Sequence, residues 1–144
     1  MVLEELEVYR LAIDIGERVW TEVARWDFFA KDTVGKQLVR AADSVAANIG
    51  EGFGRFHYKE NKHFLYYGRG SLFETKTWLL KAEKRKLISG ESHRNFEQDL
   101  NRLGRMLNAY IKSIGNDYQR VAEDGAQWNL DPSPEAGDPF ANEK

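Results

Sequence analysis

Apolar side chains recur every three or four residues along most of the chain, a spacing that places them on one face of an α-helix. In the first segment this spacing predicts a helix over roughly residues 3–25. Its apolar stripe consists of Leu6, Tyr9, Ile13, Gly16, Trp20 and Val23. A second apolar row on the same segment consists of Val8, Leu11, Ile15 and Val19. Together the two rows make an arc wider than the interior of one bundle requires.

Three further segments show the same spacing and are separated by turn residues. Residues 26–32 predict a turn, and Asp32 or Thr33 is expected to cap the next helix by accepting a free backbone N–H. That helix is expected to end near Phe56, because three nearby glycines weaken it. A third helix is predicted over 58–86, and a fourth comes after the turn at 89–92. The three stripes are Val34, Leu38, Ala41, Val45, Ile49, Gly52; Phe64, Gly68, Ser71, Thr75, Trp78, Ala82; and Phe96, Leu100, Leu103, Leu107, Tyr110, Ile114.

All three prolines come after residue 131, so none interrupts these four helices. Four helices with short links predict an all-α fold, an antiparallel up-down-up-down four-helix bundle. From residue 116 onward the period is lost, and acidic residues, glycine and proline dominate. We therefore expect a bundle domain over residues 1–116 and an acidic, disordered tail over 117–144. Within that tail Trp128, Leu130 and Phe140 are the side chains able to dock on another surface.

Composition narrows the class of protein. The chain has no cysteine, which excludes disulfides, thiolate metal sites and a cysteine nucleophile. It also has no apolar run of the ~18 residues that a membrane span needs and no signal-peptide pattern at its start. We expect a cytoplasmic protein without membrane contact. The formal net charge is only −2, but it is unevenly distributed: −4 over residues 1–54, +6 over 55–86, +1 over 87–114 and −5 over 115–144.

A row of polar side chains runs along one face of the second predicted helix. Its members are Gln37, Arg40, Ser44, Asn48, Glu51 and Arg55. On the third predicted helix Gly70, Ser71 and Glu74 offer a matching patch. We expect Asn48 and Glu51 to be partly buried and to need Arg40 or Arg55 as a partner. These residues predict a structural polar layer that fixes helix register; a solvated face is the alternative.

The third predicted helix carries two more rows. Tyr66, Phe73 and Leu80 recur every seven residues away from the core stripe and predict an interface between subunits. Basic side chains occupy an arc of roughly 100° of the same helix, a stripe suited to contacting successive phosphates. This basic stripe consists of Lys59, Lys62, Arg69, Lys76 and Lys84.

No set of residues specifies a reaction. Glu51 and Glu74 could form an acid/base pair, but no nucleophile or oxyanion donor accompanies them. Glu60 and His63 make one Glu-x-x-His motif, whereas di-iron bundles need two such motifs and further carboxylates. Residues 50–54 lack the G-x-G-x-x-G frame of a phosphate-binding loop. We therefore expect no enzyme, no catalytic residue, no metal and no cofactor.

Two motifs resemble a known family. Residues 37–44 and the run Asn48-Ile-Gly-Glu-Gly52, together with Gly70-Ser-Leu-Phe-Glu74, resemble the four-helix-bundle 23S rRNA intervening-sequence proteins over about residues 3–115. The proline that such proteins often carry before the second helix is missing, with Ala30 near that place. The signature positions carried over by motif are Gln37, Arg40, Ser44, Asn48, Glu51, Gly52, Gly70, Ser71 and Glu74.

The resemblance implies a homopentameric bundle, encoded in some bacteria within rRNA insertions and of unsettled biochemical activity. It also implies kinship with the accessory protein of diversity-generating retroelements, which binds a reverse transcriptase and nucleic acid. Nothing in the resemblance makes the signature residues catalytic.

The leading hypothesis is a non-enzymatic, ring-like homo-oligomer that scaffolds or weakly binds RNA or DNA through the basic stripe, with a reverse-transcriptase-like protein as a further partner. The alternative is an oligomer that recognises only protein partners. A nucleic-acid binder should display the five cations on an open surface, whereas a pure assembly protein should bury them against acidic residues of the first helix. An enzyme would need a pocket that joins Glu51 and Glu74.

Overall fold

The computed structural model describes residues 1–55 and 57–122, with side chains up to residue 114. Every regular element in these residues is helical and none is a strand, which confirms the all-α prediction. The four long helices are α1 (Glu7–Ala24), α3 (Lys36–Phe53), α4 (Tyr58–Lys84) and α5 (Gly90–Ala122). Three short elements accompany them: the 3-10 helix η1 (Leu3–Glu5), α2 (Phe28–Ala30) and the π-helical η2 (Lys31–Gly35).

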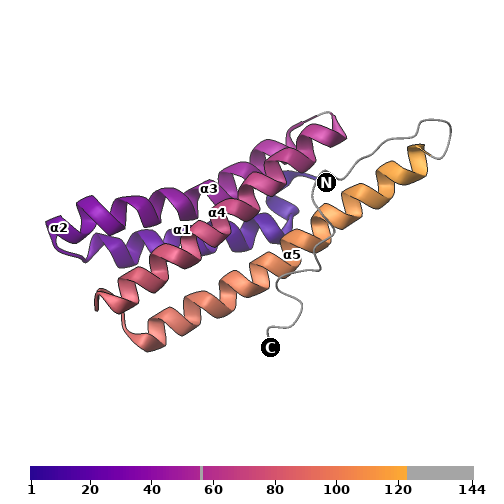
Figure 1. Cartoon of the computed structure of the whole chain (residues 1–144). Helices are drawn as coiled ribbons and strands as arrows, with labels where there is room; N and C mark the ends of the chain where they lie inside the picture. The colour runs from indigo at the N-terminus through magenta and orange to yellow at the C-terminus, as the bar shows by residue number, and fades with distance from the viewer. Residues whose placement is uncertain (56, 123–144) are drawn as a thin grey trace.

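The long helices lie side by side around one apolar core (Figure 1). Helix α3 packs against both α1 and α4, and α5 packs against α4 and α1. The core stripe predicted for the second helix is confirmed, because Val34, Leu38, Ala41, Val45, Ile49 and Gly52 are all buried. In α5 the four leading positions of the predicted stripe, Phe96, Leu100, Leu103 and Leu107, are buried as well.

Helix α1 turns a different face to the core than its predicted stripe. Val8, Ile15 and Val19, from the row interpreted as surplus, are buried, whereas Ile13 and Trp20 of the predicted stripe are exposed. Gly16 and Val23 of the predicted stripe are buried as well, so the buried face draws on both rows. Both rows have helical spacing, so the partner helix decides between them. The buried face also carries Ala12 and Gly16, whose small size allows the backbone of α3 to approach.

The second helix begins earlier than predicted, and neither Asp32 nor Thr33 caps it. Asp27 is the cap: its carboxylate Oδ1 accepts a hydrogen bond from the backbone N–H of Ala30 at 2.9 Å. From Phe28 the chain runs through α2 and η2 directly into α3. Phe28 and Phe29 of the predicted turn therefore lie in the first helical turn, while the buried Trp26 precedes the cap.

Helix α4 centres its core face on leucines that the predicted stripe omitted. Leu65, Leu72 and Leu79 are fully buried, whereas Phe64 and Trp78 are only partly buried at the edge of that face. Helix α5 continues to Ala122, past the domain end expected at residue 116. Of the predicted tail, residues 123–144 lie outside the described residues, as does Phe56.

Candidate interaction surfaces

The polar seam predicted between the second and third helices lies along the contact of α3 with α4. The Ser71 hydroxyl donates to Ser44 Oγ across the two helices at 2.9 Å. Asn48 Nδ2 donates to the Ser44 carbonyl at 2.8 Å and to Ser44 Oγ at 3.0 Å. These three partly buried side chains therefore act as hydrogen-bond partners for one another, as a polar layer that fixes helix register requires.

At the surface end of this seam an ion pair joins the same two helices. Arg40 Nη2 lies 2.6 Å from Glu74 Oε2 and 3.0 Å from Gln37 Oε1. The indole N–H of Trp78 donates to the same Glu74 oxygen at 3.1 Å. Glu74 is therefore held by a cation and by an aromatic donor, an arrangement that orients the carboxylate.

Glu51 forms a separate ion pair with Arg55. The partial burial predicted for Glu51 is wrong, because its side chain is exposed. Its carboxylate accepts from Arg55 one helical turn away, and the two side chains are 54% and 40% exposed. The Arg55 guanidinium lies 4.8 Å from the centroid of the Phe64 ring, a cation–π contact. Since Glu51 and Glu74 each have their own arginine, the structure does not assemble them into an acid/base pair.

The basic stripe of the third predicted helix is largely enclosed between α4 and α5. Lys62 is only 5% exposed. Arg69 Nη1 donates to Asn108 Oδ1 at 3.0 Å, and Lys76 Nζ donates to Asn101 Oδ1 at 2.7 Å. Only Lys59 and Lys84 of the five are exposed. The open cationic surface expected of a nucleic-acid binder is therefore absent along this stripe. The groups paired with it come from α5 and not from the first helix.

A different group of cations is exposed where α4 ends. Lys81, Lys84, Arg85 and Lys86 all lie at the surface, and Lys86 adopts a positive φ of 62° in the turn toward α5. This terminal basic cluster occupies the helix C-terminus, where the macrodipole favours positive charge. The dense run of lysine and arginine over residues 81–86 was the sequence signal for it.

Two sets of exposed apolar side chains bear on contacts with other molecules. In the predicted interface row Tyr66 is partly buried beneath the Arg69 guanidinium, at 4.8 Å, while Phe73 and Leu80 are 41% and 44% exposed. A second group, missed in the sequence, consists of Trp20, Phe28 and Phe29, which are 60%, 80% and 76% exposed. The sequence could have indicated this group through Phe28 and Phe29, because predicted turns seldom contain two consecutive phenylalanines. We call Trp20, Phe28 and Phe29 the aromatic corner.

An open groove of about 540 Å³ adjoins the aromatic corner. Trp20 and Phe28 contribute to its apolar wall together with Val23 and Val39, while Lys31, Lys36 and Arg40 place three cations on its lining beside one acid, Asp32. Within the described residues Lys31 and Lys36 make no ion pair. The groove therefore combines an apolar surface with unpaired positive charge.

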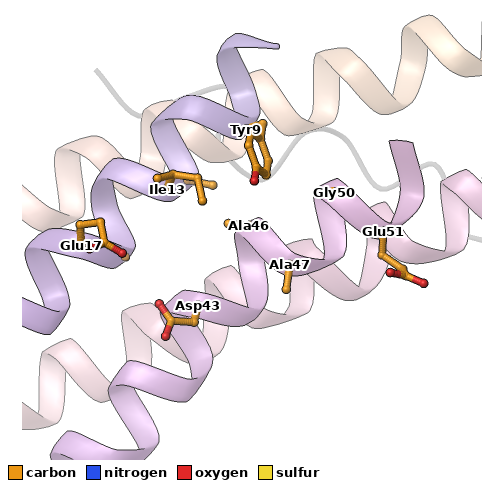
Figure 2. A pocket seen from close by; sticks show the side chains of 10 residues that line it. Tyr9, Ile13, Glu17, Asp43, Ala46, Ala47, Gly50 and Glu51 are labelled. Atoms are coloured by element: carbon orange, nitrogen blue, oxygen red, sulfur yellow. The ribbon is translucent and has the colours of Figure 1, made fainter. Parts of the chain in front are cut away.

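A second groove, of about 400 Å³, runs between α1 and α3 (Figure 2). Small residues of α3, including Ala46, Ala47 and Gly50, leave it open, and Tyr9 and Ile13 face them from α1. Burial raises the pKa of Asp43 above its ordinary value, and the nearby Glu17 carboxylate raises it further. The residues that line this groove include the three carboxylates Glu17, Asp43 and Glu51 and no lysine, arginine or histidine.

The described residues also bear on two other features, metal sites and membrane-spanning helices. Among them, no three histidine or acidic side chains are placed to hold one metal ion. None of the helices in this part of the chain combines the length and apolarity that crossing a bilayer requires.

The described residues define a small all-helical protein with a hydrogen-bonded seam between α3 and α4 and with exposed aromatic residues. Comparison with known families then identifies it: residues 4–109 match the 23S rRNA-intervening sequence protein family. The chain belongs to this family, which confirms the resemblance seen in the seam motifs. The family is not a known enzyme family, and its function is not established. No curated protein matches the chain.

Proposed function

We propose that this protein is a non-enzymatic assembly module, which associates with copies of itself through its exposed apolar surfaces and offers the remaining surface to protein partners. The observation that carries the proposal is the aromatic corner. Aromatic side chains bury 150–250 Å² each, roughly, when an interface covers them, and tryptophan and phenylalanine are enriched in interface centres. Three such side chains together exceed the scattered apolar residues of an ordinary surface.

The proposed assembly is a closed ring of up-down-up-down bundles, for which the family resemblance suggests five copies. The two exposed apolar groups lie on different elements, the aromatic corner on α1 and α2 and the Phe73–Leu80 row on α4. Two different patches allow a head-to-tail contact between neighbouring copies, and such contacts close into rings when the rotation permits. This arrangement also explains why the chain carries more apolar surface than one bundle interior requires.

Gel filtration with light scattering tests the proposal on the full chain at micromolar concentration. A mass of several chains is expected, and a monomeric mass would overturn the proposal. The double variant Phe28→Ser, Phe29→Ser should lower the mass, because it removes two exposed apolar contacts without opening the core. Phe73→Glu tests the second patch in the same way, and far-UV circular dichroism should show unchanged helicity in both. Ala109→Glu, an exposed position on α5 outside both patches, is the matched control and should leave the mass unchanged.

A second candidate function, weak binding of RNA or DNA, is supported by the terminal basic cluster. Four exposed cations at one corner of each copy would be repeated around an assembly, and repetition multiplies weak contacts through avidity. This candidate moves the phosphate-binding surface from the predicted stripe, which α5 largely covers, to residues 81–86. A reverse-transcriptase-like partner belongs to the same proposal and would be detected by co-purification.

A further inference from the structure

The groove beside the aromatic corner has the composition of a docking site for an acidic peptide that carries apolar anchors. Its wall is apolar, with Trp20, Phe28 and Val39, and two lysines, Lys31 and Lys36, stand on its lining without ion pairs in the described part of the chain. Cations beside an apolar surface attract a segment that pairs carboxylates with large apolar side chains. The residues that line this groove come from α1, α2, η2 and α3.

The chain itself contains a segment of matching chemistry after α5. Residues 123–144 hold six acidic residues and one lysine, a net charge of −5. Within this segment Trp128 and Leu130 have acidic residues on both sides, with Glu123 and Asp124 before them and Asp131 directly after. An aromatic and an aliphatic anchor flanked by carboxylates complement an apolar groove flanked by lysines.

The reach of this segment decides which copy of the chain it meets. Trp128 is the sixth residue after Ala122, and six extended residues span about 20 Å. Helix α5 has 33 residues and is therefore about 50 Å long. Its C-terminal end and α2 lie at opposite ends of the molecule (Figure 1). Trp128 therefore falls short of the groove on its own copy and meets that of a neighbour.

We propose that the acidic segment around Trp128 docks into the cationic groove beside the aromatic corner of a neighbouring copy. Trp128 and Leu130 would lie on its apolar wall, and the flanking carboxylates would pair with Lys31 and Lys36. The inference rests on the proposed self-assembly, since it needs a second copy. It adds a specific occupant for this groove and makes the acidic segment a strap between subunits.

Photo-cross-linking in the full-length protein tests the docking directly. The photoreactive residue p-benzoylphenylalanine replaces Trp128, and isotopically heavy and light chains are mixed so that mass spectrometry separates links between copies from links within one. The expected cross-links join position 128 of one copy to peptides from residues 20–40 of another. The double variant Lys31→Glu, Lys36→Glu should lose them, and adding Asp124→Lys and Asp131→Lys should restore them by reversing the charges.

The control variant Lys84→Glu, Lys86→Glu makes the same change of charge outside the groove and should keep the cross-links. Light scattering on each sample separates the two proposals. An assembled protein without cross-links in the groove, or with links that ignore the charge reversal, overturns the docking and leaves self-assembly standing. Links within a single copy overturn the docking to a neighbour. A monomeric mass overturns self-assembly as well.

Discussion

At the scale of single residues, solvent exposure determines how much each charged side chain contributes to the free energy of unfolding. Arg55 and Glu51 form an ion pair that solvent reaches from both sides, whereas Lys62 on the next helix is almost fully enclosed. Exposed pairs contribute at most about 1 kcal/mol, because water screens them and their ordering costs entropy. Breaking a buried pair costs roughly 3–5 kcal/mol, because the remaining charge is left without a partner.

The variant Glu51→Ala should therefore lower the free energy of unfolding by only about 0.5 kcal/mol, the magnitude of an exposed pair one helical turn apart. The partial burial of Glu51 expected from the sequence would instead correspond to a loss of about 3 kcal/mol. Urea unfolding at neutral pH distinguishes the two values. Glu60→Ala, an exposed acid that forms no ion pair in the described residues, provides the baseline. A loss near the larger value would show that the pair is buried within an assembly.

Substitution by alanine is expected to change stability in opposite directions at two glycines of the family motifs, Gly52 and Gly70. A Cβ at Gly52 would lie 2.8 Å from Asn61 Oδ1 and 3.0 Å from the Asn61 carbonyl oxygen, whereas a Cβ at Gly70 would meet nothing within 4 Å. Gly52→Ala should destabilise the fold by about 1–3 kcal/mol through overpacking of α3 against α4. Gly70→Ala should stabilise it by up to about 1 kcal/mol, because alanine favours the helix.

Thermal or urea unfolding of the two variants beside the parent chain measures both effects. Equal shifts of the same sign would contradict the assignment of Gly52 to the close approach of the two helices. They would also show that the exposed Gly70 has a contact in the assembled protein.

At the scale of elements, the start of the second helix shows how one capping residue sets the register of an entire helical path. Asp27 begins this path, which passes through α2 and the π-helical η2 into α3 without a break. The π turn inserts an extra residue into the helical repeat. Starting the helix at Phe28 places both phenylalanines on its first turn, which is why they form an exposed corner.

The variant Asp27→Ala should lower the free energy of unfolding by about 1 kcal/mol, since it leaves the backbone N–H of Ala30 without its acceptor. Asp32→Ala is the matched control, because Asp32 was the cap expected from the sequence and lies within the helix. It should change stability by less than Asp27→Ala does. Urea unfolding measures the stability of both variants. A larger loss of stability in Asp32→Ala than in Asp27→Ala would contradict a helix start at Phe28.

At the scale of the whole molecule, the distribution of surface properties favours assembly over a single dedicated site. The aromatic corner and its cationic groove lie at one end of the bundle, and the acidic groove lies between α1 and α3. The terminal basic cluster lies at the turn between α4 and α5. Such separated patches of opposite character suit contacts between several copies or partners better than binding of one small substrate.

For the second candidate function, an anisotropy titration with generic single-stranded RNA and DNA gives a direct test. Binding through the terminal basic cluster should weaken steeply with salt, with a log–log slope of about −0.7 per phosphate contacted. The variant Lys84→Ser, Arg85→Ser should lose most of this affinity. Lys59→Ser, Lys36→Ser removes the same charge elsewhere on the surface and should retain more. Absence of binding by the parent chain at low salt would leave the protein-only function.

The helical period of the sequence was enough to determine the fold class, the four long helices and the seam motifs that identify the family. Helix formation responds to local spacing, and the stripe of α3 and most of that of α5 were predicted because each has one dominant apolar face. The same periodicity placed the two polar patches on facing helices, where Ser71 donates to Ser44, whereas the burial expected of Glu51 is not observed.

Only the tertiary structure decided which apolar side chains of α1 are buried and which basic residues of α4 remain exposed. Val8, Ile15 and Val19 are buried because Ala12 and Gly16 on the same face allow α3 to approach closely. Arg69 and Lys76 lose their open surface because α5 places Asn108 and Asn101 beside them. Helical spacing fixes which side chains share a face, but the direction of that face depends on neighbours that are distant in the sequence.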